Sequence, residues 1–315
     1  MFATLLGALP WPDAADSADD AVIAAVRAQE AANLEPITDG RLRDRDFDAV
    51  VDGLFGVAAP VDVVANWAFA ASYTDRAVKQ ALPGPYTAGW LAIRDEVATD
   101  RDAATMRAAA ALHDVVRALA AAGCPLVEIE ETEAHRIGAD DAERARFRNA
   151  HAVLTEGIEG THLSLSLAGA AADTAGIDTV LAAPYASLAV DLINGPDNWN
   201  LVARAARERG VVVGALSAGP VEEPKEVLLW GAHYAASTAG RGIDRVGLGS
   251  AGGWTDLSWT EAERRMRALG EAARLAAMPP SEELVRSLDP RAVSARRAAL
   301  GHGPASAMPP KRRSR

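Results

Sequence analysis

The sequence predicts an α/β protein that folds as a single (β/α)8 TIM barrel. Short apolar segments alternate with longer, alanine-rich helical patterns about seven or eight times along the chain. The length of 315 residues suits one large barrel, since such barrels typically need roughly 250 residues. No Gly-x-Gly-x-x-Gly sequence follows the first expected strand, which argues against an open dinucleotide-binding sheet.

The most informative segment is residues 123–133, which runs from a glycine into a cluster of carboxylates. Apolar and acidic residues alternate from Val127 to Glu130, which is the period-2 pattern of a strand. Helical segments flank it, so we expect a buried parallel strand that ends in a polar site. Glu130 and Glu131 would lie at the end of this strand, where barrels place their chemistry. The alternative is a solvated acidic turn.

The other elements are predicted from apolar periodicity, helix caps, and glycine or proline stops. Strands are expected at residues 3–9, 36–39, 160–167, 188–193, 210–217 and 246–249. Helices are expected at residues 19–33, 46–55, 101–122, 140–154, 198–209, 222–239 and 260–277. Residues 61–69 are apolar and β-prone, and they predict a small hairpin inserted in the barrel. Residues 81–87 place two prolines around a glycine, which predicts a rigid turn.

We expect residues 1–280 to form the barrel domain and residues 281–315 to form a C-terminal helix with a flexible tail. The basic residues 311–315 end this tail, but so short a segment supplies little binding energy. The formal net charge of −11 gives no other reason to expect a nucleic-acid partner.

Two further features concern the compartment. No uncharged apolar run reaches membrane-spanning length and no signal-peptide pattern is seen, so we expect a cytoplasmic protein without membrane contact. The single cysteine, Cys124, excludes an intrachain disulfide and a cysteine-rich metal site. Its place at the start of a strand is more typical of buried packing than of a nucleophile.

Five motifs in this order resemble the C-terminal catalytic barrel of cobalamin-independent methionine synthase, a family in the same superfamily as uroporphyrinogen decarboxylase. They lie at residues 4–10 (TLLGALP), 37–41 (ITDGR), 79–87 (with Pro-Gly-Pro), 127–131 (VEIEE) and 161–164 (THLS). The resemblance covers about residues 3–277 and implies the same barrel. It also implies an enzyme that transfers a methyl group from a folate to a thiol.

The resemblance further implies a zinc site at successive strand ends. The family binds zinc through His, Cys, Glu and Cys side chains, and the metal lowers the pKa of the substrate thiol. The matching positions here are His162, Ser164, Asp191 and Ser250. Serine hydroxyls stay protonated at neutral pH and are poor zinc ligands. We therefore expect a degenerate zinc site, with zinc possible by resemblance but disfavoured.

The substrate pocket implied by the resemblance includes Ala8, Arg41, Trp90 and Ser217. Arg41 replaces a carboxylate of the family. We expect it to favour an anionic substrate, because a guanidinium pairs well with a carboxylate or phosphate. A surface salt bridge to a nearby aspartate is the alternative. Trp90 stands where the family stacks its pterin, so folate is a possible cofactor, with simple barrel packing as the alternative. Ser217 stands near the position of a histidine that serves the family as an acid.

The expected catalytic residues are His162, Glu130 and Glu131, because a histidine–carboxylate set can perform general acid–base chemistry without a metal. A satisfied polar residue on a strand face is the other interpretation of His162. The resemblance predicts a divergent barrel enzyme that transfers a methyl or alkyl group on a small substrate. The alternatives are a non-catalytic or metal-free small-molecule-binding relative, and a decarboxylase-like barrel in which Arg41 binds a substrate carboxylate.

Overall fold

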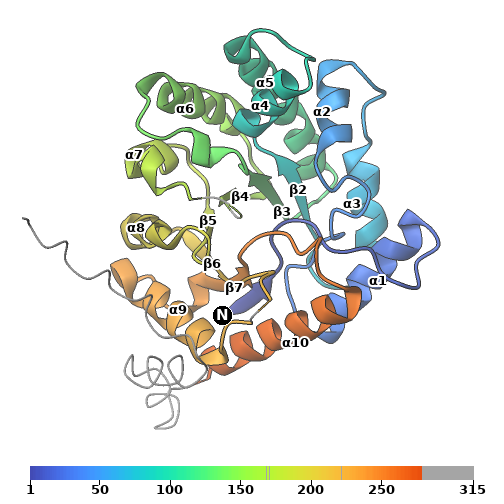
Figure 1. The fold of residues 1–315 in the computed structure, drawn as a ribbon, viewed down its shortest axis with the longest axis vertical. Helices are drawn as coiled ribbons and strands as arrows, with labels where there is room; N and C mark the ends of the chain where they lie inside the picture. Colours follow the sequence, from blue (N-terminus) through green and yellow to red (C-terminus); the bar gives the residue numbers. More distant parts are fainter. Residues whose placement is uncertain (168, 170, 221, 279–315) are drawn as a thin grey trace, which may run out of the picture.

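A curled sheet of parallel strands lies at the centre of the molecule, and helices surround it (Figure 1). The structure is a computed structural model and describes residues 1–278 except 168, 170 and 221. The strands are β1 Phe2–Thr4, β2 Lys79–Pro83, β3 Leu126–Glu130, β4 His162–Leu167, β5 Ser187–Asp191, β6 Gly210–Leu216 and β7 Val246–Ser250. The helices are α1 Ala18–Ala31, α2 Asp48–Phe55, α3 Val63–Ala71, α4 Pro85–Arg94, α5 Arg101–Ala121, α6 Asp141–Thr155, α7 Ile177–Val180, α8 Trp199–Arg204, α9 Lys225–Ser237 and α10 Trp259–Ala276.

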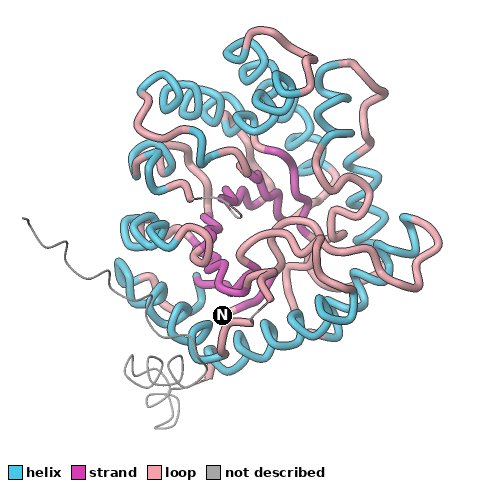
Figure 2. The backbone as a smooth tube through the Cα atoms, in the orientation of Figure 1, coloured by secondary structure: helices cyan, strands magenta, loops and turns pink. Residues whose placement is uncertain are grey.

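The sheet has the order β1-β7-β6-β5-β4-β3-β2, and every pair of neighbours is parallel. The chain therefore adds one strand after another, with the connecting helices on the outside (Figure 2). β1 and β2 are the last strands at the two ends of this order. Between them, Glu35 forms an isolated bridge with Ala3, and Ile37 forms one with Val78. The strand expected at residues 36–39 is thus present only as isolated bridges.

Most of the predicted elements are found close to their expected positions. One prediction is wrong: residues 61–69 form no hairpin, because α3 spans Val63–Ala71. The carboxylate of Asp62 caps this helix by accepting from the backbone N–H of Ala65, 2.9 Å away. Trp67 then donates from its indole to the carbonyl of Val78, which holds the helix against the start of β2. Packing and the cap thus outweigh the β propensity of the segment.

A second difference concerns residues 81–87, where only a turn was expected. They contain the end of β2 and the start of α4, with Gly84 between the two elements. The C-terminal helix and basic tail predicted within residues 281–315 lie outside the described residues. The domain boundary near residue 280 stays a prediction. Within the described part of the chain, no helix is long and apolar enough to cross a membrane.

The period-2 pattern of β3 separates its side chains into two sets. Val127 and Ile129 are fully buried in the main apolar core, which also contains Leu112 of α5. Leu126 and Glu128 instead line a cavity inside the curled sheet. Because side chains alternate along a strand, consecutive glutamates at the end of β3 face opposite sides.

Candidate functional site

A pocket of about 390 Å³ lies at the carboxyl ends of the strands. Its wall combines backbone-rich glycine segments with charged side chains from several loops. The lining includes Gly7, Ala8, Arg41, Arg45, Asp46, Phe47, Arg94, Glu130, Glu133, Gly169, Gly252 and Gly253. We call it the carboxyl-end pocket. Parallel α/β folds bind their ligands at this end, so its position agrees with the expected site.

Arg41 and Glu130 form a buried ion pair in this pocket. Arg41 Nη1 lies 2.7 Å from Glu130 Oε2, and the two side chains are 8% and 4% exposed. The predicted surface salt bridge of Arg41 to an aspartate is therefore wrong. Glu130 Oε1 is buried and has no hydrogen-bond partner in the described part of the chain. Buried carboxylate oxygens are costly to leave unpaired, so this atom is a candidate for a ligand contact.

Local structure fixes the direction of the Arg41 side chain. The backbone of Arg41 has φ of 52°, and its N–H donates to Asp39 Oδ1 at 2.8 Å. Burial raises the pKa of Asp39. The guanidinium lies 3.5 Å from the centre of the Phe47 ring and also donates to the carbonyl of Arg45. The turn thus presents the charged group to the end of β3.

The floor of the pocket is backbone. Gly7 has φ of 77°, and a Cβ at this position would lie 2.5 Å from the backbone nitrogen of Gly253. Two loops, after β1 and after β7, can therefore touch only because glycine has no side chain. Ala8 lies beside them, and its carbonyl accepts from Trp254 N at 2.7 Å. Its methyl group offers no polar contact to a ligand.

Glu131 does not share the pocket with Glu130. It is fully buried, and its carboxylate accepts from the backbone N–H groups of Tyr86 at 2.9 Å and Thr87 at 2.7 Å. These groups belong to the first turn of α4, where a negative charge is stabilised by the unpaired N–H groups. His151 Nε2 lies 2.9 Å from Glu131 Oε1. Glu131 therefore anchors a helix and is not placed to touch a substrate.

Gly84 explains why the Pro-Gly-Pro turn precedes α4. A Cβ at this position would lie 2.1 Å from the carboxyl carbon of Glu131. The carboxylate can reach the start of the helix only if the residue before it lacks a side chain. Residues 83–85 and Glu131 thus form one structural unit.

Trp90 lies on α4, and the guanidinium groups of Arg101 and Arg136 lie over its ring at 4.2 and 4.8 Å from the centroid. It is not among the residues that line the carboxyl-end pocket. Its ring is used in cation–π contacts, so the alternative of structural packing describes it better than a pterin platform.

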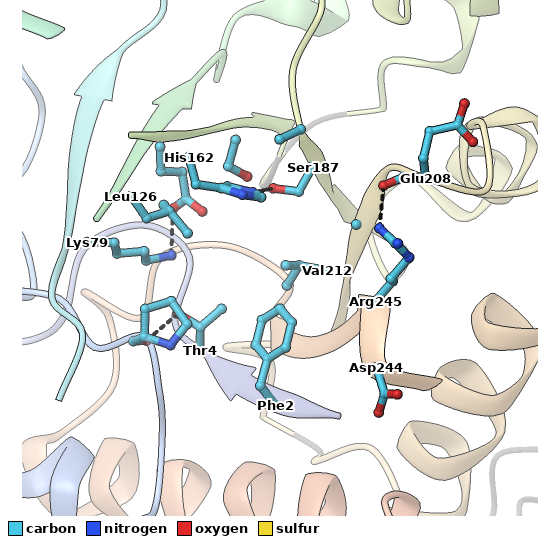
Figure 3. Close-up of a pocket in the computed structure, with 15 residues that line it drawn as sticks. Phe2, Thr4, Lys79, Leu126, His162, Ser187, Glu208, Val212, Asp244 and Arg245 are labelled. Atoms are coloured by element: carbon cyan, nitrogen blue, oxygen red, sulfur yellow. Dashed lines mark hydrogen bonds and ion pairs between the residues drawn. The ribbon is translucent and has the colours of Figure 1, made fainter. Parts of the chain in front are cut away.

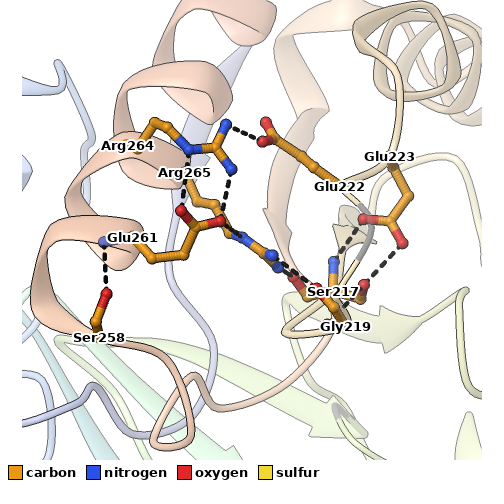
Figure 4. Close-up of polar contacts among 8 residues, drawn as sticks. All are labelled: Ser217, Gly219, Glu222, Glu223, Ser258, Glu261, Arg264 and Arg265. Atoms are coloured by element: carbon orange, nitrogen blue, oxygen red, sulfur yellow. Dashed lines mark hydrogen bonds and ion pairs between the residues drawn. The ribbon is translucent and has the colours of Figure 1, made fainter.

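Ser217, at the end of β6, is held by the loop that follows it (Figure 4). Its N–H and Oγ both bond to the carboxylate of Glu223, at 2.9 and 2.8 Å. Its carbonyl accepts from Arg265, which reaches across from α10 and is 2% exposed. These contacts fix the β6–α9 loop and leave Ser217 outside the lining of the carboxyl-end pocket.

The predicted metal ligands do not converge. Asp191 Oδ1 accepts from the N–H groups of Ile193 and Asn194 at 2.8 and 2.9 Å. Ser250 Oγ accepts from Leu6 N at 2.7 Å and donates to Leu6 O at 2.9 Å. Throughout residues 1–278 as described, no group of three or more His, Cys, Asp or Glu side chains could hold a metal ion. This donor set does not fit zinc.

His162 and Ser164 lie at the other end of the sheet. His162 is the first residue of β4, and its Nε2 lies 2.8 Å from Oγ of Ser187, the first residue of β5. The register pairs Glu130 with Ser166, so Ser166 and not His162 lies level with the carboxyl-end pocket. The expectation that His162 shares a catalytic site with Glu130 is therefore wrong.

Two features of the interior were not found from the sequence. Lys79 and Glu128 form a second buried ion pair, with 2.8 Å between Nζ and Oε1. Burial raises the pKa of Glu128. The signal was present, because Glu128 shares the period-2 face of Glu130. The contact of Phe47 with Arg41 had no such signal, since it depends on the loop fold.

The fold is that of an α/β protein with a polar pocket at the carboxyl ends of a curled parallel sheet. Residues 48–181 match the family model described as the catalytic domain of cobalamin-independent synthase. This match, over less than half of the chain, agrees with the family resemblance that the sequence motifs indicated. A search of the curated proteins found no match.

Solved structures share the fold at low sequence identity. A B12-independent methionine synthase from Shewanella sp. W3-18-1, in complex with selenomethionine, is 18% identical with a TM-score of 0.70. The match covers 90% of this chain and 98% of that chain. A methyltransferase from Methanosarcina mazei is 13% identical with a TM-score of 0.58, over 87% of this chain and 94% of that one. At such identity the likeness concerns the fold alone.

Proposed function

We propose that the carboxyl-end pocket binds a small zwitterionic amino acid and that the chain transfers a methyl or alkyl group on it. The observation that carries the proposal is the buried Oε1 of Glu130, which has no hydrogen-bond partner among the residues that the structure describes. A carboxylate whose other oxygen is held by Arg41 remains an acceptor for an ammonium group.

The charges around the pocket support a zwitterion over an anion. Three arginines and three acids line it, namely Arg41, Arg45, Arg94, Asp46, Glu130 and Glu133. With the charges balanced, a ligand that carries one group of each sign is favoured over one with net charge. The protein from Shewanella has selenomethionine bound, which is such a molecule.

The reaction class rests on the family and not on a metal site. Methyl transfer is the chemistry of the matched family, so it is the first candidate for this chain. The expected zinc ligands have other partners or lie at the far end of the sheet, so no step through zinc is proposed. Folate remains a proposal without an assigned residue. We also propose that residues 35–37 complete an eight-fold barrel between β1 and β2.

A second candidate is a binding protein that has lost thiol transfer. It is favoured by Asp191 and Ser250, whose side chains are engaged by neighbouring backbone groups. A decarboxylase-like reaction is less favoured, because Arg41, its proposed carboxylate anchor, is already paired with Glu130.

Calorimetric titration tests the binding. L-methionine and 3-(methylthio)propylamine should bind the wild type. Glu130→Gln should weaken the binding of both ligands by about tenfold, as expected for loss of a charged hydrogen bond. The analogue without an ammonium, 4-(methylthio)butanoate, should bind weakly to both proteins. The matched control is Glu133→Gln, which changes a carboxylate of the same pocket that is already paired with Arg136. Equal affinity of the wild type for L-methionine and 4-(methylthio)butanoate would contradict the proposal.

Product analysis separates the two candidates. Wild-type protein is mixed with homocysteine and a methylfolate, and its zinc content is measured after purification without chelators. Methionine formation that is lost in Glu130→Gln supports the enzyme. Methionine binding without turnover supports the second candidate. Stoichiometric zinc would contradict the account of the donor set.

A further inference from the structure

A second cavity, of about 430 Å³, opens at the amino ends of the strands. The residues that begin five successive strands line it: Lys79, Leu126, His162, Ser187 and Gly210. Figure 3 shows the side chains of Lys79, Leu126, His162 and Ser187 around a common space, with Phe2 reaching in from β1. We call it the amino-end cavity. Its lining shares no residue with that of the carboxyl-end pocket.

The sequence leaves this space open because the positions that face it are small. Barrel interiors are usually filled by bulky branched side chains. Here Ser164, Ser187 and Gly210 stand at such positions on β4, β5 and β6. On β7, a Cβ at Gly247 would lie 2.3 Å from the Phe2 ring, so the missing side chain admits this aromatic group. An aromatic wall thus faces a row of small residues.

The polar groups in the cavity are unevenly satisfied. The ion pair of Lys79 with Glu128 is almost fully buried, and the two charges cancel. His162 is paired with Ser187. Ser164, in contrast, is 2% exposed, and its Oγ has no hydrogen-bond partner among the described residues. A buried hydroxyl without a partner is uncommon and costly, which points to a ligand.

The Lys79 ammonium is a second indication that a ligand binds in the cavity. It carries three N–H donors, and in the described part of the chain only Glu128 accepts from it. The remainder of the wall includes the apolar side chains of Phe2, Leu126 and Val212. The charged residues Glu208, Asp244 and Arg245 also line the cavity, and all three are exposed to solvent. The cavity therefore offers spare donors, an apolar surface and no net charge from its buried pair.

We propose that the amino-end cavity is a second binding site, for a small uncharged molecule with an apolar body and one hydroxyl or carbonyl oxygen. The apolar body packs against Phe2, Leu126 and Val212. The oxygen accepts a hydrogen bond from the Ser164 hydroxyl. An anion is disfavoured because Glu128 would repel it, and a cation because Lys79 would. This proposal is independent of the function assigned to the carboxyl-end pocket.

The test uses three probes of similar size: benzyl alcohol, toluene and benzoate. Amide resonances of the full chain are followed by NMR during titration. Benzyl alcohol should bind with a dissociation constant on the order of 1 mM, as expected for so small a ligand. Its binding should shift the amide resonances of residues such as Lys79 and Gly210 and leave the resonances of Gly252 and Gly253 unchanged. Benzoate should not bind in this cavity.

Two variants identify the contact. Ser164→Ala should weaken the binding of benzyl alcohol about fivefold, which is the usual effect of losing one neutral hydrogen bond. The affinity for toluene should stay unchanged. Ser166→Ala makes the same change two residues further along β4 and should retain benzyl alcohol binding. No saturable binding of benzyl alcohol, shifts confined to the carboxyl-end pocket, or equal affinity for wild type and Ser164→Ala would each overturn the proposal.

Discussion

Arg41 Nη1 donates to Glu130 Oε2 across 2.7 Å and joins residues 89 positions apart in the chain. The pair lies where the turn after residues 35–37 meets the carboxyl end of β3. It orients one carboxylate oxygen of Glu130 toward Arg41, and the other oxygen has no hydrogen-bond partner within the described part of the chain. This one contact between distant segments thus determines which carboxylate oxygen the pocket offers to a ligand.

The first prediction concerns the energy of this pair. Arg41→Met should destabilise the protein by about 3–5 kcal/mol, because it leaves a buried carboxylate unpaired. The double variant Arg41→Met, Glu130→Met should be closer to the wild type than either single variant, since neither partner of this pair is left as an unpaired buried charge. Urea unfolding of the four proteins measures this. Additive single effects would show that the two side chains do not interact.

The second prediction concerns Glu131 and Gly84. Glu131→Gln should cost about 2 kcal/mol of unfolding free energy, since the N–H groups at the start of α4 lose a charged acceptor. Gly84→Ala should cost about 1–3 kcal/mol, because the new methyl group overlaps the Glu131 carboxyl group. Glu133→Gln, at the surface beside them, should change stability by less than about 1 kcal/mol. Chemical denaturation gives all three values. A Gly84→Ala protein as stable as wild type would refute the described packing.

The third prediction concerns pH. Burial lowers the pKa of His162 from its usual value of 6.5. Below that value the unfolded chain therefore binds a proton that the folded chain does not, so the folded state loses stability as the pH falls. The difference in unfolding free energy between wild type and His162→Gln should shrink or reverse from pH 7 to pH 5. NMR titration of the His162 ring checks the cause, and a midpoint at or above 6.5 would contradict it.

Much of the fold was predictable because local signals and tertiary structure agree. Caps and periodicity predicted α1, α5, α6 and α10 to within a few residues. The segment at residues 63–71 was not, since its β-prone side chains are held as a helix by a cap and by contacts with β2. Local propensity cannot report such contacts.

The site was only partly predictable. Glu130, Arg41 and Ala8 do lie together in one pocket, as expected. Glu131 was misplaced, although the alternation along β3 already put it on the opposite face. Trp90 and Ser217 stand near the expected segments, but their polar or aromatic surfaces are taken by other residues. A motif gives the order of residues and not which of them remain free.

The sequence by itself determined the alternation of strands and helices and the acidic end of β3, because these depend on residues close together in the chain. The tertiary structure alone decided which end of the sheet each polar residue occupies. His162 begins β4 while Glu130 ends β3, and the strand register places them at opposite ends. Register depends on how whole strands pack, so two residues that look equivalent in a motif can lie in different cavities.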